Sequence, residues 1–577
     1  MNKTKKTLDL RSESKLSPTD SVLYNQIAIA IRQEFITFIK ELSIPNKSSL
    51  DWWVEAPASR HLGRSFLFHY CCAFVLLKNL LDQTETIDSI LVDSKAFKII
   101  LQQYLKSVKK EIQIVLLNQP LRRIIKNYLT FIYIITLYIF RHFIYYWVYN
   151  KKKKSFSKPI VLIDTYLTPN FISIYRSYPG LWESLSQEDR ELVYFVPTLV
   201  SFSIKEYISK CKKLKESSKN YLLKDDYLLF MDYLWVFGHF VRTLRLKVNN
   251  IKFDGVDFSG LVREELYSFR GADLAIIGLL NFRFTFRLRQ KKVPIRLVVD
   301  WFENQAVDKG WNAGFRKFYP KSEIIGYQGF VVFPHYLSFY PTEFEHHCGL
   351  LPSKISVIGK GHIDQKKEFF NDIDVNTAPA FRFQGVWEKR KHYPESSYCT
   401  ILIALPIFLK ESDEILRLVV TSLEGTINKN IRVMIKIHPT NSHKIIQKVI
   451  GEHCPPYFEF VTGNFNECVE RSNVLISNAS SVCLETLAKG IPVIVVGSKC
   501  GLTHNPIPEK ITEDIWRLCY TPKEISEAIQ FYANLDENET KRHEYIGNKI
   551  CADYFEPVTR ESVRLFLNLP TLEVKAS

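Results

Sequence analysis

Two short polar segments in the C-terminal half of the chain have the residue types and spacing to bind a phosphate group. The first contains Ser480 and Ser481, which follow an apolar run at residues 473–477 and precede a helix-like stretch that ends near Gly490. Serine is favoured at helix N-termini, where free backbone N–H groups and the helix dipole attract anions. We predict that this pair contacts a phosphate. The simpler alternative is that it only caps the helix.

The second polar segment is Lys-Ile-His-Pro-Thr, which overlaps the end of another apolar run at residues 432–437. The ends of parallel strands meet at one edge of a sheet, and Pro439 would rigidify the turn there. His438 can then donate a hydrogen bond to a phosphate, and Lys436 adds positive charge. An isolated histidine is more often structural, but this one repeats the placement of the serine pair. We therefore predict one pocket formed by both segments.

The order of these motifs along the chain resembles that of a known protein family. Lys-x-His-Pro followed by a strand, a Ser-Ser loop and a helix ending in Gly-x-Pro-Val resembles the nucleotide-binding domain of GT-B glycosyltransferases. The sequence is most similar to bacterial surface-polysaccharide enzymes, namely the sialyl- and polysialyltransferases, the capsule Kdo transferases and the CDP-glycerol glycerophosphotransferases. The resemblance covers residues 400–500, with a weaker similarity of layout back to residue 159.

The resemblance implies roles for individual residues. The pair His438 and Pro439 would contact the nucleotide, and the serine pair would contact its phosphate. Many retaining members of the family carry two glutamates in this region. Glu485 occupies one of those positions, but Ser477 occupies the other, so this version of the motif is incomplete.

A candidate general base lies in the other half of the protein. The apolar run 295–299 leads into Asp300 and Glu303, which are expected at the carboxyl end of a strand. Sugar transfer to a hydroxyl needs a carboxylate that accepts the proton or, in retaining enzymes, a route through the departing phosphate. We predict Glu303 as the base, with its pKa raised by desolvation beside aromatic residues. Asp300 and Asp254 are alternatives, and a carboxylate that caps the next helix is another.

Two further loops are candidates for the same cleft. Gln328 and Gly329 follow a short apolar run, and Lys360 lies in the segment that joins the two expected domains; a structural role is the alternative for each. No Asp-x-Asp follows an expected strand, and no cluster of His and Cys residues has metal-ligand spacing. We expect transfer without a metal ion or other cofactor, with the helix dipole and side chains neutralising the phosphate.

Strand-like and helix-like segments alternate from residue 156 onward. Short apolar, β-branched runs occur at residues 159–163, 192–196, 272–279, 295–299, 323–325, 400–405, 432–437, 458–461, 473–477 and 492–496. A helix is expected over residues 225–246. Such alternation predicts doubly wound parallel sheets. We expect an α/β protein of the GT-B class. Its acceptor domain would span residues 156–340 and its donor domain residues 341–577, with a terminal helix that crosses back and a cleft between the domains.

Residues 1–155 have helical periodicity and contain an unusual segment. Residues 128–149 read YLTFIYIITLYIFRHFIYYWVY, and between Leu101 and Lys154 there are eleven basic residues and one acidic residue. The uninterrupted apolar part is shorter than the ~20 residues that span a bilayer. Arg141 and His142 would place charge inside the membrane, at a cost of at least ~2.5 kcal/mol. We predict a helix in the membrane interface on anionic lipid. A true span and a buried core helix are the alternatives.

The composition excludes several other classes of protein. The chain has 577 residues, of which 46% are hydrophobic and 24% charged, so a small module and a disordered chain are both excluded. Eleven scattered cysteines without a CxxC pair, and an N-terminus without an apolar leader, favour a reducing cytoplasm. Because the aromatic residues of the basic segment continue an aliphatic run, we do not expect nucleic-acid binding.

We therefore expect a peripheral enzyme on the cytoplasmic face of the inner membrane. It would transfer a sugar from a nucleotide donor, with CMP-sugars among the candidates, to a lipid-linked or surface polysaccharide acceptor. A CDP-polyol phosphotransferase on the same fold is one alternative. A catalytically silent GT-B-like protein that binds glycan or acts as a scaffold is the other.

Overall fold

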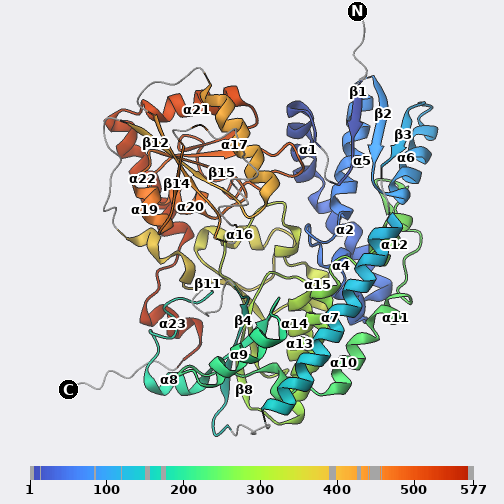
Figure 1. Cartoon of the computed structure of the whole chain (residues 1–577), viewed down its shortest axis with the longest axis vertical. Coiled ribbons are helices and arrows are strands. Elements are labelled where there is room, and N and C mark those ends of the chain that lie inside the picture. Colours follow the sequence, from blue (N-terminus) through green and yellow to red (C-terminus); the bar gives the residue numbers. More distant parts are fainter. Residues whose placement is uncertain are drawn as a thin grey trace, which may run out of the picture.

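The computed structural model has three parts, shown in Figure 1: an N-terminal unit in blue, a first α/β domain below it, and a C-terminal α/β domain in orange and red. The structure describes residues 6–12, 15–83, 86–117, 120–149, 156–169, 177–388, 398–424, 431–439, 441, 455 and 458–569.

The first α/β domain is built on a six-stranded sheet with parallel neighbours throughout. In spatial order, its strands are β11 (Val375–Thr377), β10 (Lys354–Val357), β9 (Glu323–Gln328), β8 (Ile295–Trp301), β4 (Ile160–Leu167) and β5 (Val193–Leu199). These runs are buried and largely apolar, as expected for a sheet covered on both faces. Strand β5 pairs with one edge of β4, and β8, the next strand of this sheet along the chain, pairs with the opposite edge. The topological switch point, where ligands bind in open α/β sheets, therefore lies between β4 and β8.

Three details of this domain differ from the sequence predictions. The run at residues 272–279 is the start of helix α13 (Ala272–Gln290) and not a strand, because a short apolar run does not distinguish the two. The helix expected over residues 225–246 is divided at Gly238 into α10 (Phe230–Phe237) and α11 (His239–Thr243). The sheet also continues through β10 and β11, so the domain extends past the expected boundary at residue 340.

The C-terminal domain has a second parallel six-stranded sheet with the Rossmann strand order. In spatial order, its strands are β14 (Phe458–Val461), β13 (Ile431–Lys436), β12 (Cys399–Ala404), β15 (Val474–Ser477), β16 (Val493–Val496) and β17 (Trp516–Cys519). All but β17 were predicted from the sequence. The switch point lies between β12 and β15. The expected architecture of two Rossmann-like domains after a mainly helical region is therefore confirmed.

Helices cover both sheets, and the last one returns to the first domain. The helices used below are α8 (Gln187–Leu192), α9 (Ile204–Lys215), α12 (Ser259–Tyr267), α14 (Ala306–Phe318), α15 (Glu343–His347), α17 (Leu409–Leu423), α20 (Val482–Leu487), α22 (Glu537–Tyr554) and α23 (Arg560–Phe566). Helix α23 lies beside α8 (Figure 1), where Arg564 and Asp189 form a buried ion pair. The chain therefore crosses back from the C-terminal domain before it ends.

The N-terminal unit contains a small sheet that the sequence analysis missed. Strands β1 (Lys6–Asp9), β2 (Ile87–Val92) and β3 (Gln113–Leu116) are parallel neighbours. They pack with α1 (Pro18–Ala30), α2 (Arg32–Ser43), α5 (Leu67–Asp82) and α6 (Lys95–Ser107). The expectation of helix throughout is wrong for these strands, because each is short and lies between longer helical patterns.

The N-terminal unit also contacts the C-terminal domain directly. The backbone N–H of Leu16 donates to the carbonyl of Lys499 at 2.8 Å. The N–H of Thr503 donates to the side-chain oxygen of Asn25 at 2.7 Å. The loop after β16 is thereby attached to a part of the chain far away in sequence.

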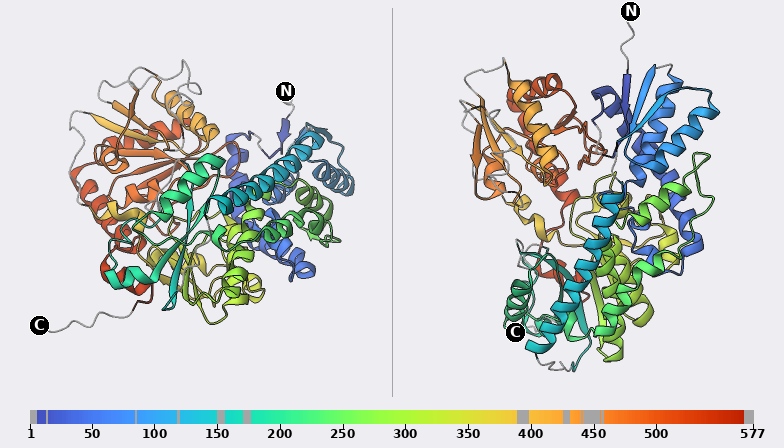
Figure 2. Two further views of the ribbon diagram at one scale, coloured as in Figure 1. Left: turned by 60° about the horizontal axis from the view of Figure 1, so that its bottom comes forward. Right: turned by 45° about the vertical axis from the view of Figure 1, so that its right-hand side comes forward.

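Helix α7 (Pro120–Val148) lies along the outside of the first domain, as Figures 1 and 2 show. Phe131, Ile135 and Tyr145 are buried against the domain, whereas Leu129 is 61% and Trp147 is 89% exposed. The segment Ile125–Val148 is long and apolar enough to cross a membrane by length and composition. Its most apolar 18 residues have a mean hydropathy of 1.4, and 28% of that stretch is buried inside the protein. Lys151–Lys154 lie outside the described residues. One apolar face of α7 is therefore open to its surroundings, which a core helix would not show.

Candidate functional site

The carboxyl ends of both sheets border one cleft of about 1000 Å³. Thr168 after β4 and Glu303 after β8 line it from the first domain, and Ser480 and Ser481 after β15 line it from the C-terminal domain. These residues follow strands that flank the two switch points. The cleft therefore occupies the position where both sheets would bind ligands.

Glu303 is a partly exposed carboxylate held by its neighbours in sequence. The indole N–H of Trp301 donates to Oε1 of Glu303 at 3.1 Å, and the amide of Gln305 donates to Oε2 at 2.7 Å. The backbone N–H of Glu303 donates to Asp308 Oδ2 at 3.2 Å, and Asp308 also caps helix α14. Both donors bond to the carboxylate while it lines the cleft, so its position is well defined.

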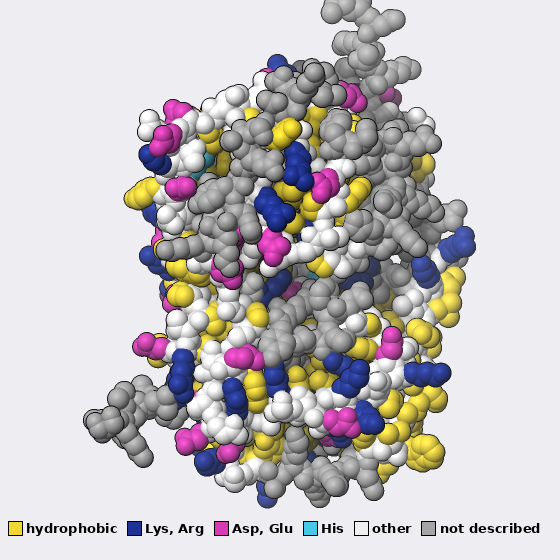
Figure 3. Space-filling model, turned by 60° about the vertical axis from the view of Figure 1, so that its left-hand side comes forward, with side chains coloured by type: hydrophobic (Ala, Val, Ile, Leu, Met, Phe, Trp, Pro, Cys, Tyr) yellow, Lys and Arg dark blue, Asp and Glu magenta, His cyan; other side chains and the backbone are white. Residues whose placement is uncertain are grey.

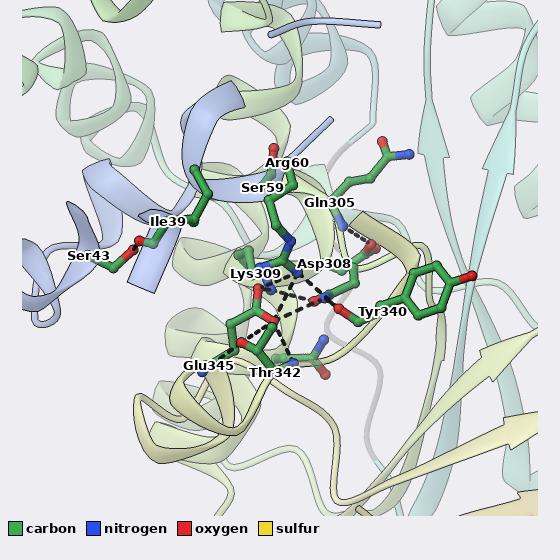
Figure 4. Close-up of polar contacts among 12 residues, drawn as sticks. Ile39, Ser43, Ser59, Arg60, Gln305, Asp308, Lys309, Tyr340, Thr342 and Glu345 are labelled. Atoms are coloured by element: carbon green, nitrogen blue, oxygen red, sulfur yellow. Dashed lines mark hydrogen bonds and ion pairs between the residues drawn. The ribbon is translucent and has the colours of Figure 1, made fainter. Parts of the chain in front are cut away.

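A buried ion network supports the loop that carries Glu303. Glu345 on α15 contacts Arg60 of the N-terminal unit at 3.1 Å and Lys309 on α14 at 2.5 Å, as Figure 4 shows. All three side chains are at most 2% exposed. Asn304, next to Glu303, donates to Glu345 Oε2 at 3.3 Å and accepts from Lys309. Burial alone would raise the pKa of Glu345, but Arg60 and Lys309 lower it to about 2.

The two alternative acids do not line the cleft. Asp300 is 1% exposed, and its Oδ2 accepts from Asn312 at 2.8 Å. Burial, together with the nearby Asp308 and Asp164, raises the pKa of Asp300 well above its usual value. Asp254 lies in the turn between strands β6 (Lys252–Phe253) and β7 (Val256–Asp257) and forms an ion pair with Lys78. Of the three acids considered from the sequence, only Glu303 faces the cleft.

The serine loop has a role other than side-chain capping of the helix that follows it. Ser481 precedes α20, but its hydroxyl does not cap the helix; it donates instead to Glu485 Oε1 at 3.0 Å. Burial raises the pKa of Glu485, while Ser481 and the charge of Arg382 oppose that shift. Arg382 lines the same cleft and was missed by the sequence analysis, because it lies in no motif. This side of the cleft thus contains two hydroxyls and a guanidinium.

The histidine-proline turn starts two strands away from the serine loop. Only β12 separates β13 from β15. With about 4.8 Å between neighbouring strands, the two turns begin roughly 10 Å apart. Lys436 Nζ donates to the carbonyl of Gly463 at 2.6 Å, and the carbonyl of His438 accepts from the N–H of Asn441 at 2.9 Å. Neither His438 nor Pro439 lines the cleft described above, so the structure does not bring them into one pocket with the serine pair as predicted; they lie at the same sheet edge, two strands away.

Two residues at the C-terminal switch point were not anticipated. Glu411 lies in the first turn of α17 after β12, and Asn478 directly follows β15. Burial and the nearby Glu414 raise the pKa of Glu411 to about 7, although Asn478 lowers it through a hydrogen bond. Within the described part of the chain, Glu411 Oε2 and Asn478 Oδ1 accept no hydrogen bond. An acid in the first turn after a strand is the sequence signal that would have found Glu411.

The remaining predicted residues lie away from the cleft. Gln328 is buried and donates to the carbonyl of Phe339 at 3.0 Å. A side chain at Gly329 would collide with Trp301 at 2.7 Å, so this glycine serves packing. Lys360 is 67% exposed and pairs with Asp553 on α22 at 3.0 Å. Among the described residues, no group of three or more His, Cys, Asp or Glu side chains has metal-binding geometry.

Comparisons with known proteins give structural neighbours only. No protein-family model and no curated protein matches the sequence. The S. aureus MnaA–UDP complex is similar at a TM-score of 0.42 and 12% identity, over 72% of this chain and 98% of the other. The glycotransferase of kitacinnamycin has the same TM-score and identity, over 72% and 100%. The UDP-GlcNAc 2-epimerase from Neisseria meningitidis bound to UDP-GlcNAc scores 0.40 with 13% identity, over 71% and 98%.

Proposed function

We propose that this protein is a glycosyltransferase that moves a sugar from a nucleotide-activated donor to an acceptor hydroxyl in the cleft. One observation carries the proposal: Glu303 of the first domain and the Ser480–Ser481 loop of the second line the same cleft, each beside a topological switch point. A carboxylate opposite an anion-binding loop is an arrangement that supports transfer of a sugar from a phosphate leaving group to a hydroxyl.

The donor would bind on the C-terminal side. Backbone N–H groups and hydroxyls of the serine loop would hold the phosphate, and Arg382 would balance the charge that develops on it as the sugar departs. His438, Pro439 and Lys436 lie at the same sheet edge, two strands from the serine loop, and would contact the part of the nucleotide that extends beyond the phosphate. These groups supply the anion-binding chemistry without a metal ion.

The acceptor would bind on the side of the first domain. The Glu303 carboxylate would take the proton from the acceptor hydroxyl while the oxygen forms the new bond to the sugar. Trp301 and Gln305 hold that carboxylate in place. The released nucleotide phosphate remains on the opposite side of the cleft, beside Arg382.

Helix α7 would hold the enzyme on the cytoplasmic face of the inner membrane. Its outer side exposes Phe140, Phe143, Tyr146 and Trp147 at 50% or more. The net charge of +16 favours an anionic surface. A lipid-linked or surface polysaccharide acceptor would be present at that place.

The test separates donor binding from chemistry. Thermal unfolding with CMP, CDP, UDP and GDP identifies the donor nucleotide, because a ligand at 100 times its Kd stabilises the fold by about 2.7 kcal/mol. Ser480→Ala should weaken that stabilisation. Glu303→Gln should preserve it and lower the transfer rate by roughly 10²- to 10⁴-fold. Full activity of Glu303→Gln would remove the assigned base. No stabilisation by any nucleotide would instead favour a scaffold protein.

A further inference from the structure

Arg141 is a buried cation that faces the cleft from α7. In the sequence it interrupts the apolar run, and it would be costly inside a bilayer. In the structure it is 3% exposed and lines the cleft together with Tyr138 of the same helix. Its guanidinium lies 5.5 Å from the ring centre of Tyr138 and 5.3 Å from that of Tyr207. Two aromatic rings therefore hold the charged group at the cleft wall.

Among the described residues, Arg141 forms no ion pair or hydrogen bond with an acidic side chain; the charge of Glu206 on α9 interacts with it only from beyond ion-pair distance. Its Nε is buried without a hydrogen-bond partner there. The nearby Asp225 accepts instead from Tyr207, Tyr233 and His142, the last at 2.8 Å. Asp273, also at the cleft, pairs with Arg64 at 2.8 Å. A buried guanidinium without an ion-pair partner is unfavourable, so this position is suited to an anionic ligand.

The wall next to Arg141 is apolar. Tyr133, Ile134, Leu137, Tyr138 and Arg141 lie on one side of α7, because their spacing follows the helical repeat. Leu274 and Ile277 of α13, a helix that packs against α7, line the same cleft. Tyr133 is also 66% exposed, so this wall continues onto the surface of the molecule. Hydrophobic side chains gather beside basic ones along one edge of the surface in Figure 3.

We propose that Arg141 binds the phosphate of an amphiphilic acceptor whose apolar chain lies along α7. This inference rests on the proposed transferase function and names the acceptor class for the same cleft. A guanidinium fits a phosphate with two parallel hydrogen bonds, which an ammonium does not provide. The apolar wall supplies the surface that the chain needs to leave water. A free sugar would use neither feature.

Binding of three probes to the full-length protein tests the site. The probes are decyl phosphate, inorganic phosphate and decyl maltoside, each below its critical micelle concentration. They are measured by calorimetry with the donor site saturated by the nucleotide that stabilises the protein most. Decyl phosphate should bind most tightly. Arg141→Gln should lower the affinity for decyl phosphate roughly 10- to 100-fold, as expected from the loss of a charge-assisted hydrogen bond. Lys126→Gln, an exposed charge removed from the same helix, should change nothing.

Each alternative result contradicts a defined part of the proposal. Equal affinity for decyl maltoside, or an unchanged affinity of Arg141→Gln for decyl phosphate, overturns it. If inorganic phosphate binds as tightly as decyl phosphate, the site binds free phosphate, and the proposal of an amphiphilic acceptor is overturned. If Arg141→Gln does not fold, Arg141→Lys provides the test, because it keeps the positive charge but not the paired hydrogen bonds of a guanidinium. Its affinity for decyl phosphate must still fall, while its affinity for decyl maltoside must not, and an unchanged affinity for decyl phosphate overturns the proposal. Arg141-dependent binding in a protein that binds no nucleotide refutes the proposed function and leaves this site intact.

Discussion

Replacing Glu345 by glutamine should destabilise the protein severely. The carboxylate is 1% exposed and neutralises two cations that are equally buried, Arg60 and Lys309. Its pKa is lowered from 4.5 to about 2. At about 1.4 kcal/mol per pKa unit, this shift corresponds to roughly 3 kcal/mol of stability. Removing one partner from a buried ion pair generally costs about 3–5 kcal/mol, which agrees with that value. We expect Glu345→Gln to lower the free energy of unfolding by about 3 kcal/mol.

Denaturant unfolding at pH 7 measures the effect, and Glu343→Gln is the matched control. Glu343 lies on the same short helix but is exposed, so its replacement should change stability by less than about 0.5 kcal/mol. The pH dependence provides a second measurement. Because the folded-state pKa of Glu345 is depressed, its contribution is complete above pH 4.5 and is lost as the pH falls towards 2. The difference between wild type and Glu345→Gln should shrink over that range.

The ion network also has a functional role that the same variant tests. Asn304 joins the network and precedes the residue assigned as base. Transfer activity of Glu345→Gln should therefore fall even at temperatures where the variant remains folded. A stability loss below about 1 kcal/mol, or one equal to that of Glu343→Gln, would refute the assignment of a strong buried network.

Three further outcomes follow from other parts of the structure. Gly310→Ala should destabilise by about 1–3 kcal/mol, since its Cβ would lie 1.7 Å from the Gly278 carbonyl; Gly260→Ala, whose nearest neighbour is 3.9 Å away, should be neutral or slightly stabilising in the same unfolding assay. The folded-state pKa of Glu411, about 7, makes the wild type lose stability as the pH rises from 4.5 to 7. Glu411→Gln cannot ionise, so the variant should be more stable than the wild type at pH 8 by up to about 3 kcal/mol more than it is at pH 4.5. Parallel pH profiles of stability for the two proteins would contradict this. Replacing Tyr146 and Trp147 by serine should weaken flotation with phosphatidylglycerol vesicles at least about tenfold without changing nucleotide binding, and unchanged flotation would exclude α7 as the anchor.

Local patterns were sufficient to predict four strands of the first large sheet and five of the second. The runs that became β4, β5, β8 and β9, and five strands of the second sheet, are apolar and β-branched and are separated by helical stretches. The same reasoning placed Glu303 and the serine loop at strand ends, which the structure shows on one cleft. Strands β10 and β11 were missed because four and three residues carry too little periodicity to be recognised.

The features that the sequence did not predict depend on contacts between distant segments. Arg60 and Glu345 are 285 positions apart, and no local pattern pairs them. Arg141 shows the same limit in another form. Hydropathy along α7 marks it as a charge in an apolar helix, but only the packing of α7 against the first domain shows that it faces a cleft instead of lipid.

The contacts of the N-terminal unit have a consequence for attempts to shorten the protein. Asn25 is bonded to the loop after β16, and Arg60 supplies one of the two charges that balance Glu345. Trimming the chain to its two Rossmann-like halves would remove both contacts at once. The shortened protein would keep every residue proposed for catalysis. Glu345, which supports the loop that carries Glu303, would however have lost one of its two buried cations. The first hundred or so residues are therefore a structural component of the folded protein and not a detachable appendage.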